Sequence, residues 1–178
     1  MKVEGTDAEV MARVRAGSRE GLGVLFDRHH QGLLGFFRRL TGQPHLAEDM
    51  AQEVFLRVLK YGRGFRDGAA FRPWFYQIAR RVHLDHLGAA VPPGPEPDTL
   101  LSPAESPLVE AVRLQDRERL ERALAALPAG RRELLLLSRD PDLSYQDLAG
   151  LYGCSEGAIK VRVHRALQEL RAAFQEEP

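Results

Sequence analysis

Apolar residues recur at spacings of three and four along most of the chain, which predicts α-helices and almost no strand. In the first half, a helix is expected after the capping box Thr6–Glu9, and a second after Ser18. The second apolar pattern continues to a stop at Thr41-Gly42. Further helices are predicted from Leu46 to Lys60 and from about Phe71 to Leu87.

The segment from Leu46 to Lys60 is strongly amphipathic. Its polar positions all fall on the face opposite its apolar row, so we expect one buried and one exposed face. The apolar row is Ala47, Met50, Ala51, Val54, Phe55 and Val58, and the polar positions are Glu48, Asp49, Gln52, Glu53 and Arg57.

Residues 88–107 are rich in proline and have little apolar periodicity. Such a composition is typical of an extended, semi-stiff linker, although a passive spacer is its commoner role. Twenty residues reach roughly 65 Å at full extension. The segment could therefore let two flanking modules occupy separate sites on a large partner.

Helical patterns resume after the linker. A helix is predicted from Leu108 to Leu127, followed by one with Pro128 in its first turn. The four-leucine run 134–137 has no polar side, which indicates a helix surrounded by others. A capping box at Ser144–Asp147 opens a short helix that ends at Gly153, and Ser155 can cap a last helix that runs to about Phe174.

The segment Tyr145–Ala166 has the spacing of a helix-turn-helix. Small residues at Ala149 and Gly153 are expected to let its two helices cross closely. Basic side chains should project from the second helix, where they can bond guanine edges or phosphates. An ordinary helical pair with solvated charges is the alternative. The projecting residues are Lys160, Arg162, His164 and Arg165.

Composition narrows the class of protein. The 178 residues carry 25 basic and 25 acidic side chains, which argues against coating nucleic acid by bulk charge. Net charge differs between segments. Residues 1–87 hold 14 basic and 10 acidic residues, whereas residues 88–107 hold no basic and three acidic residues. No apolar run approaches the roughly 20 residues of a membrane span, and no secretory signal is visible, so we expect a cytoplasmic protein without membrane insertion.

A single cysteine, Cys154, offers neither a disulfide nor a thiolate cluster. No cofactor-binding motif is present. We therefore predict an all-α fold of two small helical bundles, joined by a Pro-rich linker, with a wingless helix-turn-helix in the second. The predicted domains are 1–87 and 108–178, with 88–107 as the linker.

The two modules resemble one family independently. The C-terminal module closely resembles the promoter-binding domain of extracytoplasmic-function (ECF) sigma factors through LPAGRRELLLLSRDPDLSYQDLAGLYGCSEGAIKVRVHRALQELR. The N-terminal module matches the same family through LFDRHHQGLLGFFRRLTG, AEDMAQEVFLRVLK and FRPWFYQIAR. The resemblance covers nearly the whole chain, in the family's order and with a linker where the family has one.

The resemblance implies a transcription initiation factor that catalyses no reaction itself. Residues 1–87 would form a sigma region 2 domain, and 108–178 a sigma region 4 domain. Implied partners are core RNA polymerase (its β′ clamp and β flap), promoter DNA and an anti-sigma factor. The linker, with acidic Glu96, Asp98 and Glu105, would run through the RNA path of the polymerase.

The resemblance also assigns residues. Aromatic and arginine side chains suit an opened duplex, because unstacked bases need a ring face and phosphates need charge. Trp74 and Phe75 fit core positions at least as well, and for Trp74 a core position is favoured. Core polymerase binding falls to Asp49, Gln52, Glu53 and Phe55. Recognition and melting of the −10 element fall to Arg63, Phe65, Arg66, Arg72, Trp74, Tyr76, Arg80 and Arg81. Recognition of the −35 element falls to Ser155, Glu156, Lys160, Val161, Arg162, His164 and Arg165.

Three features depart from the family pattern. Arg81 stands where the family usually has asparagine, and the basic cluster that commonly follows Asp85 is missing. Val161 stands where a serine is frequent. The first two departures are expected to leave the grip on the DNA backbone near the −10 element weaker or shared with His83 and His86. Val161 is expected to remove one polar base or phosphate contact from the recognition helix.

Two other functions fit parts of the sequence. A stand-alone helix-turn-helix regulator, or a sigma-like modulator of polymerase, would also use the C-terminal motif. A metal-dependent enzyme would need histidine ligands, but His29 and His30 point in different directions on a helix, and His83 with His86 supplies only two neighbouring ligands. No metal-binding motif accompanies them, and no metal site is predicted. The candidate ligands for that reading are His29, His30, His45, His83 and His86.

Overall fold

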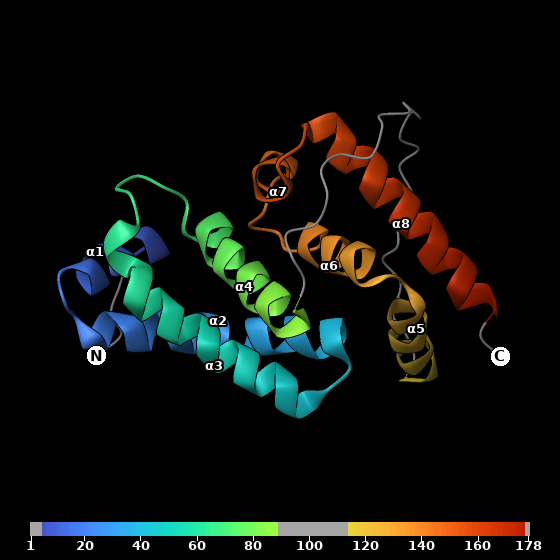
Figure 1. Ribbon diagram of the computed structural model, residues 1–178, viewed down its shortest axis with the longest axis horizontal. Coiled ribbons are helices and arrows are strands. Elements are labelled where there is room, and N and C mark those ends of the chain that lie inside the picture. The colour runs from blue at the N-terminus through green and yellow to red at the C-terminus, as the bar shows by residue number, and fades with distance from the viewer. Residues whose placement is uncertain (1–4, 89–113, 177–178) are drawn as a thin grey trace. The chain divides into compact units, whose positions relative to one another are not determined.

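The computed structural model describes residues 5–88 and 114–176, and all of their regular structure is helical (Figure 1). The chain divides into two compact units, residues 1–92 and 93–178. The predicted all-α class with two helical bundles is thereby confirmed. The linker, its acidic residues and the start of the helix expected from Leu108 lie outside the described residues, so the domain borders remain predictions.

The first unit contains α1 (Asp7–Arg15), α2 (Arg19–Thr41), α3 (Pro44–Tyr61), a 3₁₀ turn η1 (Gly62–Gly64) and α4 (Phe71–Leu87). Helix α2 packs against both α1 and α3, and α3 packs against α4. In Figure 1, α2, α3 and α4 lie together in one bundle.

Local sequence signals set these helix ends. Thr6 and Glu9 form the capping box at the start of α1, and the Ser18 side chain accepts a hydrogen bond from the Gly21 amide at the start of α2. Helix α2 ends at Gly42, whose φ of 69° is left-handed. Helix α3 begins at Pro44, two residues before the predicted start, because proline is favoured in the first turn.

The core of the first unit is a continuous apolar cluster between these helices. Each predicted apolar residue of α3 is buried, as are Phe71 and Phe75 of α4. Aromatic rings dominate the α2–α4 side, where Phe36 meets Tyr76 at 5.6 Å between ring centroids. Such pairs add specific geometry to the apolar area that they bury.

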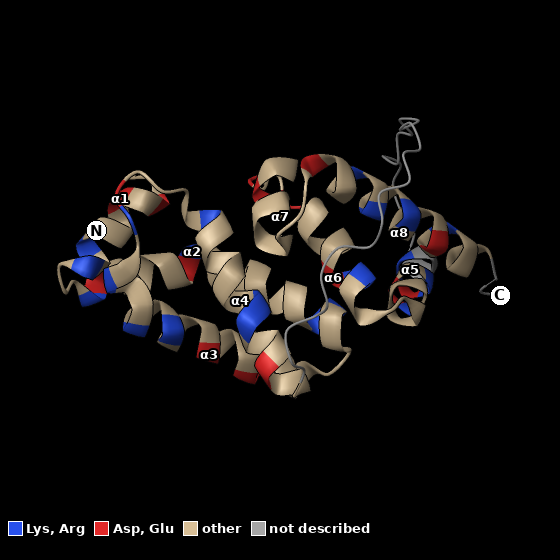
Figure 2. Ribbon diagram, turned by 45° about the horizontal axis from the view of Figure 1, so that its top comes forward, with Lys and Arg blue, Asp and Glu red and all other residues tan. Residues whose placement is uncertain are grey.

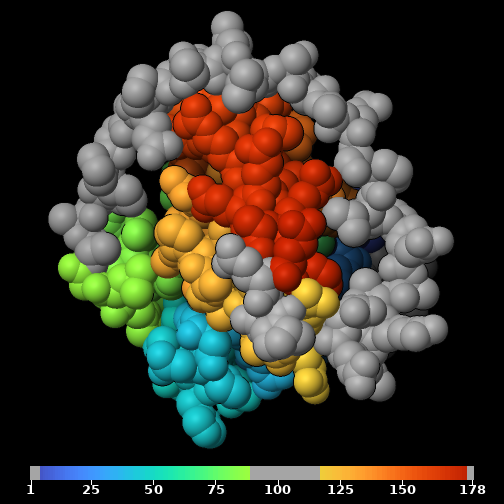
Figure 3. Space-filling model, turned by 90° about the vertical axis from the view of Figure 1, so that its right-hand side faces the viewer, coloured from blue at the N-terminus to red at the C-terminus, as the bar shows by residue number. Residues whose placement is uncertain are grey.

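The second unit contains α5 (Leu114–Ala126), α6 (Ala129–Ser138), α7 (Tyr145–Tyr152) and α8 (Glu156–Glu176). Helix α8 packs against each of the other three. In Figure 3 the side chains of α8 form a ridge bordered by those of α5 and α6. An ion pair between Arg131 and Glu169 and the Arg119 guanidinium over the Phe174 ring join α6 and α5 to α8.

Most of the leucine run lies in this core. Leu134, Leu135 and Leu137 are buried, and Leu136 is half-buried. Pro128 precedes α6 as its N-cap rather than standing in the first turn. No helix among the described residues is long and apolar enough to span a membrane.

Of the two roles expected of Gly153, only the ending of α7 is confirmed. A Cβ at this position would meet nothing within 4 Å, so the glycine is not needed for close crossing of α7 and α8. Its φ of 63° is left-handed, and its amide donates to the Ala149 carbonyl at the end of α7. The residue is glycine because the chain turns there through a conformation that L residues rarely adopt.

Replacing Gly153 should therefore destabilise the helix-turn-helix through the backbone alone. We expect Gly153→Ala to lower the free energy of unfolding of this unit by about 1–2 kcal/mol. Gly150 is the matched control, since it lies inside α7 and a Cβ there also meets nothing within 4 Å. Gly150→Ala should stabilise the unit by about 0.5–1 kcal/mol.

Hydrogen exchange of α7 and α8 amides in the full chain measures both changes. Equal exchange rates in the two variants would contradict the assignment of Gly153 to a left-handed cap.

Candidate functional site

The outer face of α3 combines polar and apolar side chains. Asp49 and Gln52 are exposed and Glu53 is half-buried. Leu56 and Leu59 lie on the same side, one and two turns beyond Gln52, and are 61% and 52% exposed. Large apolar side chains that remain exposed beside each other on a helix suit contact with a partner.

Phe55 differs from the other three residues predicted to bind a partner. Its side chain is buried and its ring lies 4.9 Å from that of Phe26 and 5.6 Å from that of Phe75. It therefore packs between α2 and α4 and supports the outer face from beneath. Sequence reasoning missed Leu56 and Leu59, although their spacing from Asp49 and Gln52 already placed them on the polar side.

A chain of ion pairs joins α3 to α4 beside this face. Arg57 contacts Glu53 at 2.8 Å and Asp85 at 2.7 Å, and Arg81 lies 3.5 Å from Asp85. The hydrogen bond from Arg57 is the largest cause that lowers the pKa of Asp85. Arg81 lies one turn before Asp85 on α4 and shares this carboxylate with Arg57.

The predicted −10 residues divide into buried and exposed groups. Phe65 and Tyr76 are buried, so their rings shape the core rather than the surface. Trp74 is half-buried, with its ring 5.1 Å from that of Phe65. The arginines of this set all reach the surface in part, and they are Arg63, Arg66, Arg72, Arg80 and Arg81.

The helix-turn-helix is built from α7 and α8. Ser144 and Asp147 form the predicted capping box of α7, and the Ser155 hydroxyl accepts a hydrogen bond from the Ala158 amide at the start of α8. The Tyr152 hydroxyl donates to the buried Glu133 carboxylate at 3.1 Å, which ties α7 to α6. The motif is therefore held to its own unit by a partly buried hydrogen bond as well as by packing.

The inner row of α8 leaves two outer sides. Ile159, Val163 and Ala166 are buried against the other helices. Glu156, Lys160 and His164 follow one another at four-residue spacing on one side, and Val161 and Arg165 do so on another. Arg162, the remaining predicted −35 residue, is half-buried.

The outer surface of α8 carries charged side chains of both signs. Lys160 pairs with Glu156 at 2.8 Å, and this hydrogen bond is the largest cause that raises the pKa of Lys160. Figure 2 shows acidic and basic positions interspersed along the helix. Both groups of the pair are about half exposed, so either can exchange its partner for a nucleic acid group at small cost.

Among residues 5–88 and 114–176, no group of three His, Cys, Asp or Glu side chains is placed to hold a metal ion. His29 is buried beside Asp7, and His83 is buried in α4. The histidines considered as ligands of a metal enzyme are therefore not assembled into one site in the part of the chain described.

A helix-turn-helix unit together with a separate helical unit that exposes an amphipathic face defines a DNA-binding protein with a second binding module. Comparison with known proteins narrows this class to one family. Residues 25–90 match the model of Sigma-70 region 2, and residues 117–170 match that of Sigma-70, region 4.

The RNA polymerase sigma factor CarQ of Myxococcus xanthus is 31% identical, over 90% of this chain and 93% of its own length. Among solved structures, CnrH in complex with the cytosolic domain of CnrY is similar in fold, with a TM-score of 0.73 and 22% identity over 97% of this chain and 99% of that one. The sigma factor RpoE of Bartonella quintana, in complex with the anti-sigma factor NepR, gives a TM-score of 0.63 and 24% identity over 86% and 96%.

The chain belongs to the ECF sigma factors of the RNA polymerase sigma family. Its role is in promoter-specific transcription initiation.

Proposed function

We propose that this protein binds core RNA polymerase through the outer face of α3 and carries it to promoters with −10 and −35 elements. The observation that carries the proposal is the exposed face of α3, where Leu56 and Leu59 lie beside Asp49 and Gln52. A stand-alone helix-turn-helix regulator has no need for such a face on a separate unit. The factor acts by binding and positioning, and the chemistry belongs to the polymerase.

In this proposal α4 and the loop before it hold the −10 element. Arg63, Arg66 and Arg81 reach solvent and suit phosphate contacts. Trp74 is the aromatic side chain of the predicted set that is not fully buried, so it is the one suited to meet an unstacked base. Phe65 and Tyr76 contribute by supporting that surface from within the core.

The −35 element is assigned to the outer sides of α8. Lys160 and Arg165 can bond guanine edges or phosphates, and Glu156 can accept a hydrogen bond from a cytosine amino group. Val161 offers only an apolar contact, which suits a thymine methyl group. The proposed recognition helix begins at a fixed point, since Gly153 and Ser155 set its first turn.

The proposal also assigns each unit to a part of the polymerase and adds one further partner, an inhibitor. The β flap of the polymerase is expected to hold the second unit, and the β′ clamp the first. An anti-sigma factor is expected as the inhibitor, because the structurally similar RpoE of Bartonella quintana was solved with one. Such a protein works where polymerase and chromosome are, in the cytoplasm.

Reconstitution tests the proposal as a whole. The full chain should co-purify with core polymerase and support run-off transcription from a matched promoter selected with the holoenzyme. A chain that neither joins core polymerase nor stimulates initiation would refute the proposal. Footprinting without polymerase separates the alternative, since a stand-alone regulator protects its site unaided whereas this protein should protect it poorly.

The apolar part of the α3 face gives a specific prediction. Leu56→Asp places a charge in the centre of the proposed contact and should weaken binding to core polymerase by about 2 kcal/mol or more, roughly thirtyfold. Leu87→Asp is the control, because Leu87 is 57% exposed on α4, outside this face. Titration of labelled protein with core polymerase measures both, and equal losses would remove α3 from the interface.

The proposed recognition helix gives a second specific prediction. Lys160→Ala should lower the affinity of holoenzyme for its −35 element by about 1–3 kcal/mol and relax the preference for one base pair. Arg171→Ala, three turns along α8 and also exposed, should leave base preference unchanged. Selection of promoter sequences with each holoenzyme gives the readout. An identical consensus for wild type and Lys160→Ala would show that Lys160 reads no base.

A further inference from the structure

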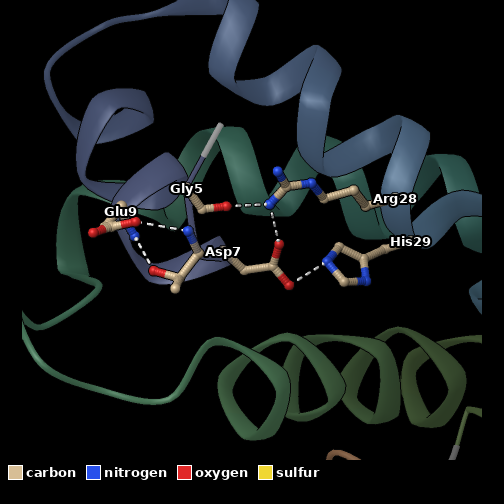
Figure 4. Close-up of polar contacts among 6 residues, drawn as sticks. Gly5, Asp7, Glu9, Arg28 and His29 are labelled. Atoms are coloured by element: carbon tan, nitrogen blue, oxygen red, sulfur yellow. Dashed lines mark hydrogen bonds and ion pairs between the residues drawn. The ribbon is translucent and has the colours of Figure 1, made fainter. Parts of the chain in front are cut away.

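A buried histidine and a single carboxylate connect α1 to α2. Nε2 of His29 lies 2.6 Å from Oδ2 of Asp7, and Nη1 of Arg28 donates to Oδ1 of Asp7 at 2.9 Å (Figure 4). Arg28 also donates to the Gly5 carbonyl at 2.9 Å. Two consecutive residues of α2, Arg28 and His29, thus bind the first turn of α1 through the two oxygens of the Asp7 carboxylate.

The other side of the same histidine ring faces the start of α4. His29 is only 6% exposed, and its ring centroid lies 5.1 Å from that of Phe71 and 5.6 Å from that of Phe75. Phe71 in turn contacts the rings of Phe65 and Trp74 at 6.4 Å and 6.1 Å. One imidazole therefore connects α1 to the aromatic cluster below the proposed −10 surface.

Helix α1 reaches the same segment at two more points. Gly62 approaches Met11 so closely that a Cβ there would lie 2.6 Å from the Met11 methyl group. Arg15 forms an ion pair with Asp67 in the loop before α4. Asp7, Met11 and Arg15 follow at four-residue spacing, so one face of α1 braces the segment from Gly62 to Phe71 along its length.

We propose that α1 is a positioning element for promoter opening. Asp7 of α1 fixes the position of the His29 ring, and the His29 ring in turn fixes Phe71 at the start of α4. The proposal rests on the assignment of the −10 element to this segment. Its exposed arginines and half-buried Trp74 can receive an opened strand only when the loop and the first turn of α4 are fixed. None of these positioning residues needs to touch DNA.

The charged groups around His29 predict that the contacts of its ring depend on pH. The groups that face the ring are Asp7 from α1, Arg28 from α2 and Arg72 from α4. Burial is the largest cause that lowers the pKa of His29 below its ordinary value of 6.5; Asp7 opposes this, while Arg72 and Arg28 add to it. The neutral ring donates from Nε2, since the carboxylate can only accept, and its buried Nδ1 has no hydrogen-bond partner.

The sign of the pH effect follows from the lowered pKa. As pH falls below 6.5, the unfolded chain takes up a proton at this histidine before the folded chain does. The stability contributed by the neutral ring is present above that pH and is lost as pH falls through the folded-state pKa. Acid should therefore loosen the first turn of α1 and disturb the aromatic cluster beside it.

Trp74 is the only tryptophan of the chain and lies in this cluster, so its fluorescence reports the cluster directly. In the wild-type full chain, emission should change as pH is lowered from about 7.5 to about 5. His29→Gln should abolish that transition. His30→Gln is the matched control, because His30 stacks on Phe26 instead and should leave the transition intact. A transition that persists in His29→Gln overturns the pH signature.

Promoter opening by the holoenzyme tests the positioning role. Asp7→Asn, His29→Phe and Arg15→Ala should each slow opening of duplex promoter roughly tenfold, because a displaced binding segment loses its productive geometry. Their affinity for core polymerase should remain that of wild type. On a template whose −10 region is already unpaired, the three variants should initiate at nearly the wild-type rate.

The outcomes separate this inference from the function on which it rests. Wild-type holoenzyme that fails to open a selected promoter would overturn the proposed function and this inference with it. Wild type that opens the duplex while all three variants open it equally fast would overturn the positioning role alone. Asp7→Asn and Arg15→Ala keep the test decisive if His29→Phe does not fold, since both change partly exposed side chains.

Discussion

Burial of one face of α3 is the constraint on which the first unit depends. Ala47, Met50, Ala51, Val54 and Val58 are fully enclosed between α2 and α4. Because the helix repeats every 3.6 residues, placing this row inside fixes Asp49, Gln52, Leu56 and Leu59 outside. The core and the proposed polymerase face are therefore two consequences of one periodicity. Any rotation of α3 that altered the outer face would also expose part of the core.

The second unit depends in the same way on burial of one face of α8. Its inner row packs against α5, α6 and α7, while its outer sides carry the charged residues proposed to read DNA. The link from α7 is only Gly153 to Ser155, with a left-handed glycine and a capping serine. So short a connection leaves little freedom in the angle between the two helices. A fixed angle is what a helix needs if its side chains are to meet successive base pairs in register.

Much of this architecture could be predicted from the sequence because the signals are local. Capping boxes at Thr6 and Ser144, and the apolar row of α3, place helices without knowledge of tertiary contacts. The orientation of aromatic side chains could not be predicted in this way. Phe65 and Tyr76 were grouped with the exposed arginines of the −10 set, yet both are buried, since packing between separate helices decides which ring turns inward.

Contacts between distant segments also escaped sequence reasoning. The Asp7–His29 contact spans 22 positions and the Arg15–Asp67 pair spans 52. The spacing of apolar and polar residues along the chain predicts neither contact. Leu56 and Leu59 escaped for another reason. Their spacing was visible, but a leucine on a polar face is usually unremarkable until a structure shows that it remains exposed.

The neutral charge of the chain is consistent with a factor that reads DNA while another protein supplies most of the grip. Lys160 is paired with Glu156 on the proposed recognition helix, so its attraction for phosphate is weakened at long range. An exposed pair of this kind contributes little to stability, so its exchange for a base or phosphate at contact costs little. Binding then depends on close fit rather than on accumulated charge, and a factor built in this way selects sequence best when polymerase holds it against the duplex.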